Sequence, residues 1–324
     1  MKVLKFGGTS VGSPQSLLNV KKIVDDLNDD AIVVVSALSK VTNKLIELAD
    51  AAQNGDEQRV DKLLTWIYRR HCAIINAVYT RRPTINAVRR ELKSIIQDKL
   101  RAACQRLMCA GDDAQLARDV RNQIVTTGEM MSSVIVSVLL GARLEVSTRF
   151  IKTRNIDGCD VLVEDLTQAL IASQFRNLKA AVTVVQGFVA QDCETLAITT
   201  LGRGGSDFTA ALIAAALNAS CLEIWTDVDG FMTADPRKDR KASVIPRMTY
   251  EEAQQRCDAG AKVIYPPTIK PVALKGIPVW VKNTLNPATR GTRIGNPKVE
   301  PGPAKIDKDK QIFDQKQFTI QWDS

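Results

Sequence analysis

Leu201-Gly202-Arg203-Gly204-Gly205-Ser206-Asp207 and the opening Lys5-Phe6-Gly7-Gly8-Thr9-Ser10 are two glycine turns, each preceded by an apolar, β-branched run and followed by a helical pattern. Without β-carbons, a turn at the start of a helix lets backbone N–H groups approach a phosphate closely. Lys5 and Arg203 add positive charge beside these turns, and Asp207 adds a carboxylate. Two such turns in one chain predict a cradle for two anionic reactants.

Composition places the chain among ordinary folded proteins, because 45% of its 324 residues are hydrophobic and 25% are charged. That length suffices for one large domain or two. The 7 cysteines form no CxxC pair, and His71 is the single histidine. These counts argue against a zinc site and against a Ser-His-Asp hydrolase. The sequence also has no signal-peptide core and no apolar run of membrane-spanning length. We therefore expect a cytoplasmic protein with reduced cysteines and no membrane partner.

The net charge of +8 raises the question of a nucleic-acid partner. Much of the excess positive charge lies between Arg69 and Arg106, where aromatic residues are sparse. No stacking platform for bases therefore accompanies the charges, and the region is typical of a solvated helical face. The alternative use of this charge is attraction of anionic substrates such as ATP. We expect no nucleic-acid partner.

Apolar runs alternate with helical patterns along the chain. Ala31–Val35 is typical of a strand buried on both faces. Strands separated by helices indicate a parallel sheet with helices on both sides. We expect strands at 3–6, 31–35, 144–148, 182–189, 222–226 and 277–282. We expect helices at 16–27, over most of 43–121 with a break at Pro83, at 129–140 and at 208–217, with turns at 126–128 and 191–192.

The last segment, 296–324, is rich in proline and lysine and is typical of a linker. Phe318–Trp322 has the pattern of one strand, which cannot form a domain by itself. We predict one folded domain over 1–295 and a linker-like tail over 296–324. The natural protein either ends there or continues into another domain.

The common nucleotide-binding motifs are absent from the sequence. Neither GxxxxGK[ST] nor GxGxxG occurs. The single histidine also excludes the His-Arg-Asp loop of protein kinases, because His71 is not part of such a motif. A phosphate site in this chain therefore belongs to another class.

Short motifs follow one another in a fixed order: Lys5–Ser10, Thr127–Glu129, Gln186–Phe188, Leu201–Asp207, Trp225–Gly230, Asp235–Arg237, Gly260–Val263, Lys282–Thr284 and Gly291–Thr292. In this order they resemble the aspartate kinases over about residues 1–295. The resemblance implies the amino-acid kinase fold, an α/β three-layer αβα sandwich with a central, mostly parallel eight-stranded sheet. It also implies an N-terminal lobe that binds the amino acid and a C-terminal lobe that binds ATP.

The implied reaction transfers the γ-phosphoryl group of MgATP to the β-carboxylate of L-aspartate. This is the first step toward the aspartate-derived amino acids lysine, threonine and methionine. A carboxylate with a pKa near ~4 is already ionised at neutral pH, so the reaction needs no general base. The enzyme must instead align the reactants and neutralise negative charge. The implied cofactors are ATP and Mg²⁺, with the ion held mainly by the ATP phosphates and by no protein metal site.

The resemblance assigns the catalytic roles to Lys5 and Asp207. Lys5 would bind the β- and γ-phosphates and follow the charge through the transition state, while Asp207 would hold Lys5 in place. Asp207 also has the alternative role of N-cap for the helix expected from Phe208. The N–H groups around Gly7, Gly8 and Gly204 would hold the transferring group.

The amino acid would bind between a cation and an anion. Arg203 is the expected clamp for the α-carboxylate, because its planar fork suits bidentate binding. Glu129 would pair with the α-ammonium group, and its apolar neighbours predict that it is buried rather than on the surface. Further substrate contacts implied by the resemblance are Ser36, Thr42, Phe188, Gly204 and Ser206.

The nucleotide contacts implied by the resemblance are Lys5, Gly7, Gly8, Thr9, Ser10, Thr226, Asp227, Met232, Arg237 and Lys262. Arg237 alone, after Asp-Pro, could equally be a plain turn residue. The chain departs from the family pattern at three positions. Lys40 stands where many members have glycine, Met232 where tyrosine is usual, and Tyr265 where histidine is usual.

Two alternatives stay open. One is a sister kinase of the same fold that acts on glutamate, acetylglutamate, carbamate or UMP, and the other is a non-catalytic ATP-binding regulator. A homodimer is the candidate assembly. Because the paired regulatory domains of the family are not among these residues, we expect lysine and threonine to leave the activity unchanged.

Overall fold

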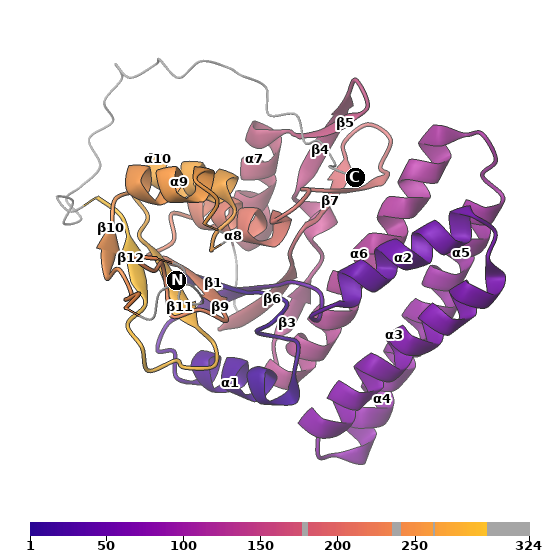
Figure 1. Ribbon diagram of the computed structural model, residues 1–324, viewed down its shortest axis with the longest axis horizontal. Coiled ribbons are helices and arrows are strands. Elements are labelled where there is room, and N and C mark those ends of the chain that lie inside the picture. Colours follow the sequence, from indigo (N-terminus) through magenta and orange to yellow (C-terminus); the bar gives the residue numbers. More distant parts are fainter. Residues whose placement is uncertain (177–180, 235–240, 262, 297–324) are drawn as a thin grey trace.

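The computed structural model describes residues 1–176, 181–234, 241–261 and 263–296. Its centre is an 8-stranded sheet in the order β10-β12-β11-β9-β1-β2-β6-β3, in which every neighbouring pair is parallel except β11 and β12 (Figure 1). The predicted mostly parallel sheet is thus confirmed. The strands are β1 (Lys2–Phe6), β2 (Ala31–Val35), β3 (Arg143–Glu145), β6 (Val182–Gln186), β9 (Leu222–Thr226), β10 (Arg247–Met248), β11 (Val279–Asn283) and β12 (Thr292–Ile294).

Alternating side chains of the central strands enter two separate cores. Leu4 and Phe6 pack into one core, whereas Val3, Ile32 and Val34 pack into the other. Each fully buried side chain of this kind stabilises the fold by about 1.5–3 kcal/mol relative to an exposed one. Continuous apolar runs such as β2 are therefore required, and the three-layer sandwich is confirmed.

The two faces of the sheet carry different sets of helices. On one face lie α1 (Pro14–Asp25) and α6 (Ala114–Leu140), and the bundle α2–α5 packs on α6 (Figure 1). The bundle comprises α2 (Val41–Gln53), α3 (Glu57–Val78), α4 (Arg82–Ser94), the π-helix η1 (Ile95–Leu100) and α5 (Arg101–Met108). The other face carries α7 (Glu164–Phe175), α8 (Gly205–Ala216), α9 (Tyr250–Asp258) and α10 (Ile269–Leu274), with the 3₁₀ turns η2 (Ser147–Arg149) and η3 (Pro266–Thr268).

The turn expected at 126–128 is wrong, because α6 runs unbroken from Ala114 to Leu140. Gly128 is buried within it, and a β-carbon there would lie 2.8 Å from Cβ of Ala37. Glycine is needed here for close packing and not for a turn. Among the described residues, α6 is the one helix long and apolar enough to cross a membrane, but 67% of its apolar window is buried inside the protein.

The strand expected at 182–189 is also wrong in its second half. β6 ends at Gln186, and Phe188 has a φ of +69° that redirects the chain. β7 (Val189–Asp192) then joins a second, 4-stranded sheet in the order β5-β4-β7-β8, so the turn expected at 191–192 follows Asp192 instead. The other strands of this sheet are β4 (Lys152–Ile156), β5 (Cys159–Leu162) and β8 (Ile198–Thr200).

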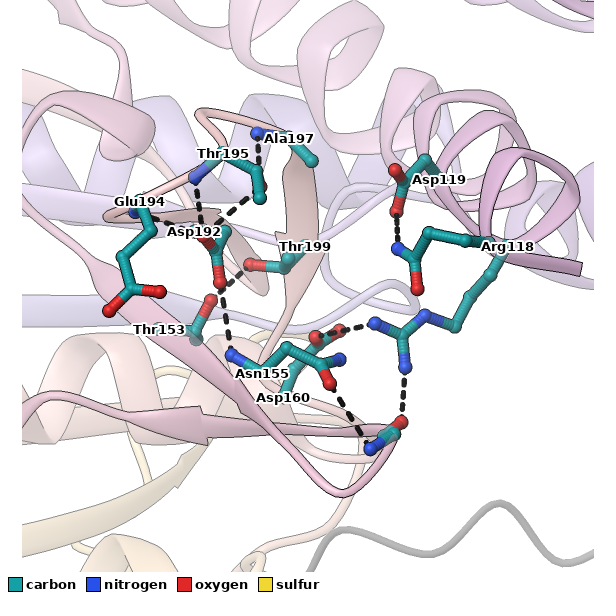
Figure 2. Close-up of polar contacts among 12 residues, drawn as sticks. Arg118, Asp119, Thr153, Asn155, Asp160, Asp192, Glu194, Thr195, Ala197 and Thr199 are labelled. Carbon is teal, nitrogen blue, oxygen red and sulfur yellow. Dashed lines mark hydrogen bonds and ion pairs between the residues drawn. The ribbon is translucent and has the colours of Figure 1, made fainter.

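Asp192 closes the β7–β8 hairpin (Figure 2). Its side chain is 3% exposed, and Oδ1 accepts hydrogen bonds from the backbone N–H groups of Glu194 and Thr195 and from the Thr195 hydroxyl. Oδ2 accepts the N–H of Asn155 on β4 at 3.0 Å. Burial by itself raises the pKa of Asp192, but these donors together hold it below its usual value.

The neighbouring β4–β5 hairpin is tied to α6. Arg118 Nη2 lies 3.5 Å from Asp160 Oδ1, and Arg118 Nη1 donates a hydrogen bond to the carbonyl of Gly158 (Figure 2). The side chain of Asn155 accepts the Gly158 N–H at 3.1 Å. The second sheet is therefore fixed to α6 by these polar contacts and by a small apolar cluster, in which Val189 of β7 and Ile198 of β8 pack with Val125 of α6.

We predict that Asp192→Ala lowers the free energy of unfolding by about 2–4 kcal/mol at pH 7, because partly buried N–H groups lose a charged acceptor. The folded-state pKa of Asp192 is lowered, so its contribution is complete above the unfolded pKa of about 4 and is lost as the pH falls through the folded value. Urea unfolding at pH 7 and below pH 4 measures both effects. Glu194→Ala keeps its backbone N–H and is the control, expected to change stability by less than ~1 kcal/mol. Equal stability of Asp192→Ala and wild type at pH 7 would refute this role.

Candidate active site

Several of the predicted site residues lie at or just after the carboxyl ends of parallel strands, where open α/β sheets bind ligands. The chain leaves β1 through Gly7, whose N–H donates to the carbonyl of Trp225 at the end of β9. Ser10 also donates to that carbonyl at 3.0 Å and contacts the Thr284 hydroxyl at 2.6 Å. Ser36, just after β2, donates its N–H to the carbonyl of Phe6. The first glycine turn is thus anchored to three neighbouring strands. Trp225 and Thr284 also belong to this edge of the sheet, and the sequence indicated them only through the motifs Trp225–Gly230 and Lys282–Thr284.

Lys5 and Asp207 lie together at this edge. Lys5 Nζ is 2.6 Å from Asp207 Oδ1, and both side chains are largely buried. A β-carbon on Gly7 would lie 3.2 Å from Lys5 Nζ, so glycine leaves room for the ammonium group. α8 begins at Gly205 with Gly204 as its N-cap, so the alternative role of Asp207 as N-cap is wrong. Asp207 occupies the first turn of the helix instead.

Glu129 is buried on α6 and faces the loop after β2. Its Oε1 accepts the N–H of Ala37 at 3.1 Å, whereas Oε2 has no hydrogen-bond partner among the described residues. Burial raises the pKa of Glu129 to about 7, although the Ala37 N–H and the charge of Lys5 act to lower it. An unpartnered buried carboxylate oxygen is costly, and a ligand that donates to it would remove that cost.

The loop 36–42 is clamped onto the first glycine turn. Ser39 donates its N–H to the carbonyl of Gly8 at 3.0 Å, and a β-carbon on Gly8 would lie 3.0 Å from the carbonyl oxygen of Ala37. Ser36 and Thr42 are both half-buried at the two ends of this loop, and Thr9 is exposed. Lys40 has a φ of +71°. The backbone at this position therefore favours glycine, and lysine is held in a conformation that costs about 1–2 kcal/mol.

The second glycine turn stands beside Phe188. The carbonyl of Phe188 accepts the N–H of Leu201 at 2.9 Å, and its N–H donates to the Thr209 hydroxyl at 3.0 Å. Ser206 is buried so close to Gly187 that a β-carbon there would lie 2.6 Å from Ser206 Oγ. Arg203 is exposed in the turn itself. Phe188 and Arg203 thus lie at the base of the β7–β8 hairpin whose tip is closed by Asp192.

The predicted nucleotide contacts are only partly described. Thr226 ends β9, and its hydroxyl donates to the Asp227 carboxylate at 3.1 Å. Met232 is half-buried and pairs with Val244 in an isolated bridge. The predicted contacts Arg237 and Lys262 lie outside the described residues.

No group of three or more His, Cys, Asp or Glu side chains that could hold a metal ion is present in the part of the chain that the structure describes. The acidic groups at the site are engaged, since Asp207 contacts Lys5 and Glu129 accepts the Ala37 N–H. These residues fit a Mg²⁺ ion that is brought by the nucleotide and ligated by phosphate oxygens and water.

Comparisons with known proteins agree with this geometry. Residues 1–283 match the amino acid kinase family. The chain is 32% identical over 305 residues to a bifunctional aspartokinase/homoserine dehydrogenase of Buchnera aphidicola, which covers 91% of this chain and 36% of that protein. It is 31% identical over 306 residues to the lysine-sensitive aspartokinase 3 of Escherichia coli, which covers 91% of this chain and 64% of that one.

A solved structure extends the likeness to the fold. The crystal structure of E. coli aspartokinase III in complex with aspartate and ADP superposes with a TM-score of 0.81 at 30% identity, covering 93% of this chain and 65% of that one. The chain therefore spans less than two thirds of the length of these relatives, between 36% and 65%. The match over residues 1–283, with the shared sandwich and its glycine turns, establishes that this chain belongs to the amino acid kinase family.

Proposed function

We propose that this protein is an aspartate kinase, which transfers the γ-phosphoryl group of ATP to the β-carboxylate of L-aspartate and forms 4-phospho-L-aspartate and ADP. The observation that carries the proposal is Glu129, a buried carboxylate whose Oε1 accepts the N–H of Ala37 beside the first glycine turn and whose Oε2 has no hydrogen-bond partner within the described part of the chain. An α-ammonium group fits this oxygen, because it supplies both a donor and a compensating charge.

The placement of the other residues supports the following roles. Lys5, aligned by Asp207, neutralises the charge that develops on the transferring phosphoryl group. The N–H groups of the first glycine turn and of the start of α8 hold the phosphate oxygens. Arg203 holds the α-carboxylate, and the β-carboxylate then points at the phosphorus atom without any proton having to move. Mg²⁺, when bound with ATP, supplies further charge neutralisation at the phosphates.

The relatives support this assignment over the sister kinases. One neighbouring structure contains aspartate and ADP, and the curated relatives are aspartokinases. Acetylglutamate, carbamate and UMP carry no free α-ammonium group for Glu129. Glutamate has one, but its reacting carboxylate is one methylene further from the α-carbon. A non-catalytic regulator would have no need of the Lys5–Asp207 pair.

Incubation with MgATP, a candidate acceptor and hydroxylamine tests the substrate, because an acyl phosphate is trapped as a hydroxamate. We predict hydroxamate formation with L-aspartate at a rate at least about tenfold above that with L-glutamate, since a methylene is worth ~1–3 kcal/mol in a fitted site. Omission of ATP is the control for direct acylation. Equal rates with glutamate, or turnover of UMP alone, would overturn the assignment.

The proposal extends to the biological setting. We also propose that the enzyme is cytoplasmic and that it serves the synthesis of lysine, threonine and methionine. The names of two relatives, a bifunctional aspartokinase/homoserine dehydrogenase and a lysine-sensitive aspartokinase, support the second point. The division into an aspartate lobe and an ATP lobe within residues 1–295, and a homodimeric assembly, belong to the same proposal.

A further inference from the structure

We propose, resting on the function above, that Tyr265 is a positioning residue that holds the Arg203–Gly204 turn in the shape needed to bind the α-carboxylate of L-aspartate. Tyr265 lies in the segment between α9 and η3, far along the chain from the second glycine turn.

The ring of Tyr265 packs directly on Gly204. A β-carbon added to Gly204 would lie 2.8 Å from Cδ2 of Tyr265 and closer still to its Cβ and Cγ. Gly204 also has a φ of +72°, which side chains rarely adopt. Glycine at position 204 therefore meets two requirements. It adopts the positive φ of the turn, and without a β-carbon it lets the aromatic face of Tyr265 lie on the backbone beside Arg203.

The backbone of Tyr265 contacts the catalytic pair. Its N–H donates to Asp207 Oδ2 at 3.2 Å, while the other carboxylate oxygen faces Lys5 Nζ at 2.6 Å. One residue thus touches both the group that aligns the catalytic lysine and the turn that carries the carboxylate clamp. Tyr265 therefore connects the turn that carries Arg203 to Asp207 through its ring and its backbone N–H.

Tyr265 is itself held firmly. The preceding Ile264 is 4% exposed, and the carbonyl of Tyr265 accepts the N–H of Thr268 at 3.0 Å to begin η3. Pro266 and Pro267 follow and restrict the backbone further. Burial raises the pKa of the Tyr265 hydroxyl, so the side chain is neutral at physiological pH. The backbone around Tyr265 is therefore restricted, and its ring packs against the glycine turn.

Without the ring, the Arg203–Gly204 turn loses its support on one side. Glycine has the greatest backbone freedom to regain, so the guanidinium of Arg203 would sample more positions. Binding of L-aspartate must then order the turn again, which weakens binding, whereas phosphoryl transfer from the bound complex changes less. The expected signature is a raised KM for L-aspartate with kcat largely retained.

The test compares Tyr265→Ala and Tyr265→Leu with Tyr265→Phe and Tyr265→His in the hydroxamate assay. The Ala and Leu variants are expected to raise KM for L-aspartate by about tenfold, with kcat and the KM for MgATP changed by less than about threefold. The Phe and His variants keep a flat ring and are expected to stay within about twofold of wild type. If Tyr265→Ala does not fold, judged by thermal unfolding, Tyr265→Leu carries the comparison.

A double-mutant cycle with Arg203→Lys shows whether Tyr265 acts through Arg203. Lysine keeps the charge at position 203 but loses the fork. If the ring acts by placing that fork, the KM increases of Tyr265→Leu and Arg203→Lys are not additive. Additive effects, a loss of kcat at constant KM, or equal defects in the Phe and Leu variants would each overturn the proposal. A wild-type protein that forms no hydroxamate would instead refute the proposed function.

Discussion

Lys5→Ala is expected to lower kcat for the phosphorylation of L-aspartate by about 10²-fold or more. The Lys5 ammonium lies 2.6 Å from Asp207 at the carboxyl edge of β1, beside the turn formed by Gly7 and Gly8. Charge develops at this point as the phosphoryl group transfers, and removing one fixed cation from such a site costs several kcal/mol of transition-state stabilisation. The KM for L-aspartate should change much less, because other groups bind the amino acid.

Lys2→Ala is the matched control for Lys5→Ala. Lys2 lies on the same strand but at its opposite end, where it is 4.0 Å from Glu223. Its replacement should leave kcat unchanged. Thermal unfolding of both variants shows whether a loss of kcat comes from a loss of folding. Asp207 still accepts the N–H of Tyr265 when Lys5 is replaced, so we expect Lys5→Ala to fold. A near-normal kcat in Lys5→Ala would mean that Arg203 or Mg²⁺ supplies the required charge.

Glu129→Gln is expected to lower kcat/KM for L-aspartate by about 10²-fold, because the α-ammonium group loses its charged partner. In the wild type, kcat/KM should fall about tenfold for each pH unit below about pH 7, since Glu129 with a pKa of about 7 becomes protonated and cannot pair with the ammonium group. In Glu129→Gln this limb of the profile should disappear. The profile is measured from pH 6 to pH 8.5 at sub-saturating L-aspartate.

The same substitution should raise stability without ligand. A carboxyl whose folded pKa is raised from 4.5 to about 7 destabilises the fold as the pH rises through that interval. Glu129→Gln should therefore unfold at a higher temperature than wild type at pH 8 and differ little at pH 4. Binding residues at functional sites commonly lower the stability of the ligand-free protein.

Glu145→Gln is the control for the pH profile of kcat/KM. Glu145 is also buried, but its carboxylate is paired with Arg143 at 2.5 Å on β3, away from the site. Its replacement should leave the pH profile of kcat/KM unchanged. A flat wild-type profile between pH 6 and pH 8.5, or an unaltered KM in Glu129→Gln, would contradict the role of Glu129.

Local sequence patterns were sufficient for six of the eight strands of the main sheet and for its two glycine turns, but they did not predict β10 and β12. Ala31–Val35 is apolar at every position because the strand is buried on both faces, and that pattern can be recognised without knowing its neighbours. The turns around Gly7 and Gly204 could be predicted because glycine clusters between a strand and a helix have few other uses. The same patterns allowed Lys5 to be placed on a strand beside a phosphate turn.

Other features depend on partners that lie far away in the sequence. Gly128 resembles a turn residue, but its reason is the side chain of Ala37 packed against α6. The strands β4 and β5 of the second sheet are short and partly exposed, so they carry no apolar run, and Asp192 connects β4 to the β7–β8 hairpin through a polar contact. Local propensity cannot predict either arrangement, because the deciding contact is tertiary.

The properties of the site also divide into those that the sequence indicated and those that depend on the tertiary structure. Residue type together with the resemblance to the aspartate kinases indicated Lys5, Glu129 and Arg203 as candidates for contacts with phosphate, ammonium and carboxylate. The pairing of Lys5 with Asp207, the unpartnered oxygen of Glu129 and the packing of Tyr265 on Gly204 come from the folding of distant segments onto one edge of the sheet. Burial and proximity set the pKa and orientation of these groups, and both are properties of the packed molecule rather than of any short stretch of the chain.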